Sequence, residues 1–139
     1  MHLETTFDVQ RSRASTAEIV ARDETLPALF PDTKTEIIER KGNRRTLRTH
    51  YRALGRDGTA TFRFQFLPAG EVRFEKICDG RVWRELRGLI SLEARGEKTR
   101  IHVELRGRTQ SLIPEFTIRG PMREQLDQMA AALRELLEA

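Results

Sequence analysis

Residues 120–139 read GPMREQLDQMAAALRELLEA, and this stretch decides the fold. Its apolar residues recur at steps of three and four, at Met122, Leu126, Met129, Leu133 and Leu136 or Leu137. That spacing is typical of an amphipathic helix that buries one side. Pro121 follows Gly120, where a first helical residue needs no N–H partner, so we expect the helix to begin there and run to Ala139. Its apolar stripe requires an apolar surface to pack against.

The residues before this helix predict such a surface, because they read as strands separated by short turns rich in Gly, Asn and Asp. Residues 3–9 alternate apolar and polar side chains, as a half-buried strand does. Six further strands are expected at residues 33–41, 44–54, 59–68, 71–78, 82–94 and 99–107. Connections as short as Gly42-Asn43 and Asp79-Gly80 join antiparallel neighbours. The pattern therefore predicts a seven-stranded antiparallel sheet.

Side-chain alternation assigns one apolar face to this sheet. The expected inner face carries mainly Leu, Val, Ile and Phe, at Leu47, Phe62, Phe64, Phe66, Val72, Phe74, Leu86, Ile90, Leu92, Ile101, Val103 and Leu105. The opposite face is rich in Arg, Glu and His. A sheet of this kind is covered on one side and wet on the other, and residues 120–139 are the one long amphipathic element available as the cover.

Two short helices are expected between the first and second strands. Ser15 and Glu18 have the spacing of a capping box, which predicts a helix that starts at Ser15. Residues 23–25 can cap a second short helix, which Pro31 ends. Residues 110–119 are interrupted by Pro114 and are expected to form an irregular or short helical lead-in to the C-terminal helix.

Composition narrows the class of protein. A length of 139 residues suits one domain, 1–139, with a core large enough to need no covalent staples. Cys78 is the single cysteine, so no intrachain disulfide can form. The N-terminus lacks a signal-peptide pattern, and no apolar run approaches the ~20 residues of a membrane span. We therefore expect a cytoplasmic protein, and no motif indicates a cofactor.

The order strand, two short helices, six-stranded meander and long helix resembles the helix-grip fold of the START-like (SRPBCC) superfamily. That superfamily includes polyketide cyclases and dehydratases, coenzyme Q-binding proteins and lipid-transfer domains. The likeness rests on IVARDETLPALFP at residues 19–31, RGLISL at 87–92 and GEKTRI at 96–101. These are similar to the family's "D…LP…P" passage, "G…W.L" strand and "G.T.V" hairpin. Leu89-Ile90 stand where many relatives have a tryptophan, which leaves the subfamily open.

The resemblance implies a curved α+β fold with a cavity between the sheet and the C-terminal helix. It implies binding or transport of a hydrophobic or amphipathic small molecule, such as a lipid, a quinone or a polyketide-like compound. Because one fold hosts many functions, an enzyme of cyclase or dehydratase type is the alternative, and we favour binding over catalysis. The expected cavity lining comprises Tyr51, Phe62, Phe64, Phe66, Phe74, Lys76, Ile90, Val103, Met122, Leu126 and Met129.

Three polar residues, Tyr51, Lys76 and Arg84, fall on the expected inner face and are the catalytic candidates. Tyr can act as an acid, and Lys or Arg can hold a carboxylate or enolate. The simpler interpretation is that each lies near a strand end and turns outward, or that a bulge displaces Arg84. Unpaired buried charge is rare, so we favour the simpler interpretation.

A basic segment suggests a third function. Residues 34–56 hold eight Lys or Arg against two acidic residues. The residues Arg40, Lys41, Arg44, Arg45 and Arg48 can contact nucleic acid or anionic lipid. Charges on a sheet edge also prevent strands of different molecules from pairing, and we favour that interpretation.

No metal site is expected from the sequence. His2, His50 and His102 lie far apart along the chain and are all expected on the wet face. No paired-cysteine or closely spaced histidine motif occurs.

Overall fold

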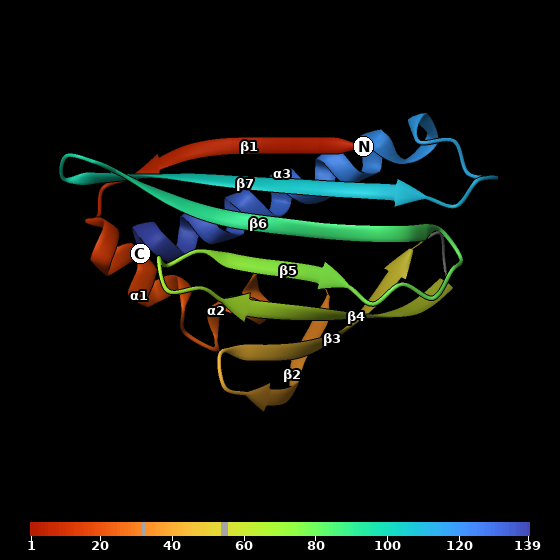
Figure 1. Cartoon of the computed structure of the whole chain (residues 1–139), viewed down its shortest axis with the longest axis horizontal. Helices are drawn as coiled ribbons and strands as arrows, with labels where there is room; N and C mark the ends of the chain where they lie inside the picture. Colours follow the sequence, from red (N-terminus) through yellow and green to blue (C-terminus); the bar gives the residue numbers. More distant parts are fainter. Residues whose placement is uncertain (32, 54–55) are drawn as a thin grey trace.

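The computed structural model describes residues 1–31, 33–53 and 56–139. It contains one sheet and three helices within those residues (Figure 1). In chain order these are β1 (His2–Val9), α1 (Arg13–Val20), α2 (Thr25–Ala28), β2 (Lys34–Lys41), β3 (Arg44–Ala53), β4 (Arg56–Phe66), β5 (Val72–Lys76), β6 (Trp83–Arg95), β7 (Lys98–Thr109) and α3 (Phe116–Glu138). The predicted order of elements is confirmed. The predicted end of the third strand at Leu54 and the turn residue Gly55 lie outside the described residues.

The sheet is antiparallel, with strand order β1-β7-β6-β5-β4-β3-β2. Strands β2 to β7 follow one another as a meander, whereas β1 pairs with β7 at the far edge. Gly42 and Gly96 begin the two-residue turns of the β2–β3 and β6–β7 hairpins with φ of 58° and 63°. Such turns need positive φ at this position, which glycine adopts without strain.

Burial follows the predicted alternation. Inner-face residues Leu47, Phe64, Phe74, Ile90 and Val103 are all at most 2% exposed and belong to one core. Arginines that alternate with them along the strands point to solvent. The prediction of one apolar and one wet face is confirmed.

Helix α3 begins earlier than predicted. It starts at Phe116, so Pro121 lies inside the helix rather than at its first position. The missing N–H of Pro121 removes the bond to the carbonyl of Thr117, one turn earlier. The added turn places Ile118 against the core, and that burial favours the longer helix. The predicted stripe is buried, at Met122, Leu126, Met129, Leu133 and Leu137.

Helix α3 packs mainly over one side of the sheet. It approaches β1 and β7 most closely and also contacts α2, which in turn packs beside β2 (Figure 1). The inner face is therefore covered by α3 on one side and by α2 on the other. None of the described helices combines the length and apolarity that a membrane crossing requires.

Helix α1 also begins earlier than predicted. Its N-cap is Ser12, whose side-chain oxygen accepts the N–H of Ser15 at 3.2 Å, so Ser15 lies in the first turn. The Thr16 hydroxyl donates to the Ser12 carbonyl at 2.8 Å, and both Thr16 and Val20 are buried. Ser12 thus takes the capping role that the spacing of Ser15 and Glu18 had suggested.

Candidate functional site

The inner face of the sheet is fully buried in its middle and becomes partly exposed toward one end. Phe64 on β4 and Phe74 on β5 are 0% and 2% exposed. Nearer the β3–β4 hairpin, Phe62 and Lys76 are half-buried and directly opposite each other, and Tyr51 is 39% exposed. The inner face therefore becomes accessible at the hairpin end.

Aromatic rings lie along the inner face from its buried middle to its partly exposed end. Phe64 stacks on Phe74 with ring centroids 5.1 Å apart, and Phe62 contacts Phe30 at 5.0 Å. Phe30 also meets the edge of the Phe64 ring at 6.1 Å. Phe30 follows α2 and was not among the expected lining residues, because its position depends on how α2 folds back on the sheet. The rings form a continuous apolar wall from the core to the half-buried end.

At that end a hollow of about 450 Å³ opens between the start of β2 and the β3–β4 hairpin. Its lining is mostly polar: Thr33, Lys34, His50, Tyr51, Arg52, Asp57, Gly58 and Thr59. The Tyr51 ring lies flat over Gly58, where an added Cβ would be 2.5 Å from the ring. The hollow thus combines one aromatic ring with several cationic and hydroxyl groups.

A chain of threonine hydroxyls connects this rim to the inner face. Thr33 donates to the Phe30 carbonyl at 2.7 Å and lies 2.8 Å from the hydroxyl of Thr35. Thr35 donates to Thr49 at 2.7 Å, and Thr49 is 4% exposed. These bonds satisfy polar groups that would otherwise be buried without partners, and they hold β2, β3 and the turn after α2 together.

The expected cavity-lining residues fall into three sets. Phe64, Phe74, Ile90, Val103, Met122, Leu126 and Met129 are buried core residues. Tyr51, Phe62 and Lys76 lie toward the hairpin end, and Tyr51 lines the hollow. Phe66 is half-buried at the opposite end of β4, where the Arg45 guanidinium lies over its ring at 5.5 Å.

The three catalytic candidates are separated. Arg84 is exposed and donates to the Ser111 hydroxyl at 3.0 Å, because a register shift between Trp83 and Glu85 breaks the alternation of β6. The expectation that Arg84 lies on the inner face is therefore corrected. Among the described residues no hydrogen bond joins any two of Tyr51, Lys76 and Arg84. Of the three candidates, Tyr51 and Lys76 remain on the inner face.

The basic segment is partly committed to ion pairs. Arg40 and Arg45 donate to the two carboxylate oxygens of Asp23 at 2.9 Å and 2.8 Å. These hydrogen bonds, from Arg40 first and then from Arg45, hold the pKa of Asp23 below its ordinary value. Arg45 also donates to the carbonyls of Gly42 and Arg44. The exposed Lys41, Arg44 and Arg48 make up the rest of the expected anionic-partner patch.

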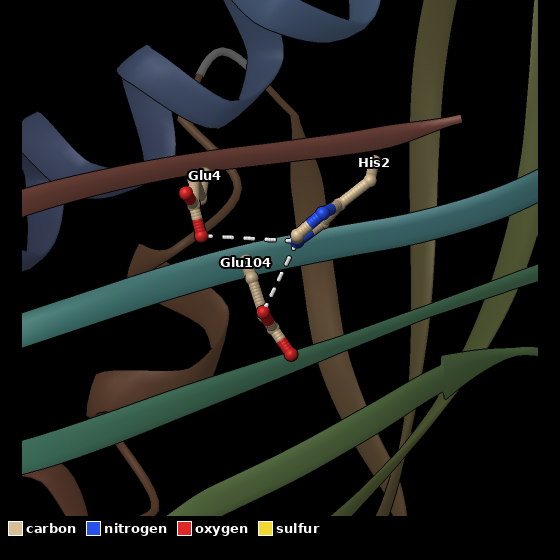
Figure 2. A group of neighbouring side chains, drawn as sticks. All are labelled: His2, Glu4 and Glu104. Carbon is tan, nitrogen blue, oxygen red and sulfur yellow. Dashed lines mark hydrogen bonds and ion pairs between the residues drawn. The ribbon is translucent and has the colours of Figure 1, made fainter.

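A polar cluster on the outer face was not anticipated. His2 and Glu4 on β1 lie beside His102 and Glu104 on β7 (Figure 2 draws the first two with Glu104). All three histidines lie on the wet face as expected, but two of them, His2 and His102, lie beside the same two glutamates. The available signal was the repeated His-x-Glu spacing, at residues 2–4 and 102–104. Only the pairing of β1 with β7 brings the two together.

Comparison with solved structures identifies the fold. The chain is similar to the Zhui aromatase/cyclase from Streptomyces sp. R1128, with 17% identity, a TM-score of 0.77 and coverage of 99% of this chain and 90% of the other. A START superfamily protein from Mycobacterium smegmatis matches with 20% identity, a TM-score of 0.76 and coverage of 98% and 96%. A STAR-related lipid transfer protein from Xanthomonas axonopodis matches with 14% identity, a TM-score of 0.72 and coverage of 98% and 85%.

No protein-family model and no curated protein matches the sequence. At these identities the structural matches establish the fold. The chain has the START-like helix-grip fold that its sequence predicted.

Proposed function

We propose that this START-like fold binds a hydrophobic or amphipathic small molecule, such as a lipid, a quinone or a polyketide-like compound, at the hairpin end of the inner face. The observation that carries the proposal is the change in exposure along that face, from sealed Phe64 to half-buried Phe62 and Lys76 and accessible Tyr51. Ligand sites are typically apolar and concave, with a few polar groups that fix orientation.

The polar and apolar parts of the ligand have separate places in this proposal. The Phe30–Phe62 wall accepts the apolar part, and Tyr51 with Lys76 and the threonine chain orients the polar end. Deeper entry toward α3 requires displacement of core side chains. Met122 and Met129 suit that role, because unbranched thioether side chains repack at low cost. The solved structures of similar fold support the proposal, since their names include a lipid transfer protein and an aromatase/cyclase.

A cyclase- or dehydratase-type reaction is the second candidate. Tyr51 and Lys76 are the groups it would use for proton transfer and for stabilising an enolate, because Arg84 points away from the inner face. Lys76 lies opposite Phe62, so a lysine and an aromatic wall face the same space. The binding proposal needs only this juxtaposition, whereas the enzyme needs turnover that depends on both residues.

The test uses two phenylalanines of the same strand. Phe62 and Phe66 both lie half-buried on the inner face of β4, on either side of the buried Phe64, and Phe66 is at the end of the strand away from the β3–β4 hairpin. Binding of 8-anilino-1-naphthalenesulfonate and of a fluorescent fatty acid is measured by titration. We expect Phe62→Ala to weaken binding about tenfold, the equivalent of one lost aromatic contact, and Phe66→Ala to leave it nearly unchanged.

Native mass spectrometry of protein purified from its own host complements the titration by detecting a retained ligand. Equal effects of the two substitutions would place binding elsewhere. Absence of probe binding and of any copurified molecule would refute the proposal. Turnover of a polyketide-like substrate that disappears in both Tyr51→Phe and Lys76→Met would favour the cyclase instead.

A further inference from the structure

The polar cluster on the outer face, formed by His2, Glu4, His102 and Glu104, is built by strand pairing. Because side chains alternate along a strand, His2 and Glu4 share the outer face of β1, and His102 and Glu104 share the outer face of β7. In the register of these strands Glu4 is opposite Glu104. Each histidine is therefore brought to the glutamates of both strands, on the face opposite the proposed ligand site. Figure 2 shows this arrangement for His2.

Four side-chain atoms form a closed ring in this cluster. His2 Nε2 lies 3.2 Å from Glu104 Oε2 and 3.8 Å from Glu4 Oε2. His102 Nε2 lies 3.1 Å from Glu4 Oε2 and 3.9 Å from Glu104 Oε2. The same two carboxylate oxygens thus face both imidazoles.

These separations suit a tetrahedral metal ion. Zinc binds nitrogen and carboxylate oxygen at about 2.0–2.2 Å, which sets neighbouring ligand atoms of a tetrahedron roughly 3.3–3.5 Å apart. The four nitrogen–oxygen separations above bracket that value, and the ligand atoms of His2, Glu4 and Glu104 lie within 4.8 Å of one another. Small side-chain rotations bring these three to one ion, and a larger rotation of His102, which already lies beside both carboxylates, adds the fourth ligand. Two imidazoles with two carboxylates favour zinc, cobalt, nickel or copper over magnesium or calcium, which prefer oxygen ligands alone.

Neighbouring groups hold the ligands in place. The Thr6 hydroxyl lies 2.9 Å from Nδ1 of His102, so it can accept the Nδ1 proton and leave Nε2 as the metal ligand. Arg123 on α3 donates to the Glu4 carbonyl at 2.7 Å and fixes that part of β1. Arg106 approaches the other oxygen of Glu104, with Nε 3.7 Å from Oε1. Ligating histidines and carboxylates usually have such supporting partners.

We propose that His2, Glu4, His102 and Glu104 bind one divalent transition-metal ion of the zinc class and so link β1 to β7. The side chains are between 20% and 55% exposed, so ions reach them directly from solvent. Glu104 also borders an outer-face hollow of about 370 Å³ that is lined by Arg73, Arg87 and Arg106. The competing description is a set of surface ion pairs with protonated histidines, which would need no metal.

The experiment uses the full chain without an affinity tag, freed of metal by a chelator. Calorimetric titration with Zn²⁺ at pH 7.5 is expected to give one ion per chain. Co²⁺ is expected to give the intense visible absorption of a tetrahedral site. His102→Ala should weaken Zn²⁺ binding at least about tenfold, and Glu104→Gln should do so without removing side-chain volume.

His50→Ala is the matched control, since His50 is an exposed outer-face histidine on β3, distant from the cluster in strand order. It is expected to bind Zn²⁺ as the unaltered chain does. Circular dichroism checks that each variant is folded. Absence of Zn²⁺ binding to the folded chain, or binding that survives both His102→Ala and Glu104→Gln, would overturn the proposal. Binding lost in His50→Ala but kept in His102→Ala would do the same.

Discussion

Replacement of Gly88 by Ala tests the packing of the aromatic wall. The Phe74 ring lies directly on the backbone at Gly88, and an added Cβ would be 2.1 Å from its Cζ. Ordinary contact begins at 3.4 Å, so the ring must shift by more than an ångström. On its other side Phe74 stacks on Phe64, which is fully buried, so no space receives the ring.

The sign of the change in unfolding free energy shows whether the new methyl group clashes with the Phe74 ring. Without a clash, alanine in a strand would stabilise by about 0.5–1 kcal/mol relative to glycine. Overpacking a filled core costs about 1–3 kcal/mol, so we expect Gly88→Ala to be destabilising. The melting temperature should fall by about 3–5 °C for each kcal/mol in a chain of this size.

Urea unfolding followed by circular dichroism measures the effect. The cost of Gly88→Ala should shrink in a Phe74→Leu background, because leucine lacks the ring atoms that meet the new methyl group. A stabilising Gly88→Ala, or a cost that is the same with and without Phe74, would refute the packing argument.

Three further predictions concern other parts of the chain. Gly120→Ala in α3, where an added Cβ meets nothing within 4 Å, should stabilise by up to about 1 kcal/mol in the same urea assay, and a loss of stability would contradict the helix assignment there. Asp23→Asn should destabilise by less than about 1 kcal/mol at pH 6, since Asp23 is partly exposed. Because the folded-state pKa of Asp23 is lowered, its stabilisation is complete above the ordinary value of 3.8 and is lost as pH falls through the folded pKa, so wild type and variant should converge in acid. Thr49→Val should cost about 1–2 kcal/mol in thermal unfolding, because the hydroxyl of Thr35 loses its acceptor, and an unchanged melting temperature would argue against that bond.

The fold was predictable because strand alternation and helical spacing are local signals. The inner-face positions Leu47, Phe64 and Val103 were assigned correctly since each strand keeps its period of two. Helix ends were predicted less well. Pro121 and the Ser15–Glu18 pair carry start signals, yet tertiary burial of Ile118 and capping by Ser12 begin both helices earlier.

The candidate sites depend on contacts that the sequence does not express locally. A bulge at Trp83 to Glu85 turns Arg84 outward, and a bulge is a one-residue irregularity without a fixed sequence signal. Phe30 joins the aromatic wall only because α2 folds onto the sheet. The approach of His2 to Glu104 depends on the β1–β7 register, which becomes known once the strand order is known.

The pairing of β1 with β7 also orders events during synthesis. Thr6 and His102, which touch across this pair, are 96 positions apart, so β1 leaves the ribosome long before its partner strand exists. The meander from β2 to β7 can form from sequential hairpins, whereas closing β1 onto β7 requires the largest loop of any strand pairing in the described sheet. Until then the apolar residues Leu3 and Val9 lack their cover, and a nascent chain with such a strand is vulnerable to aggregation and to chaperone capture.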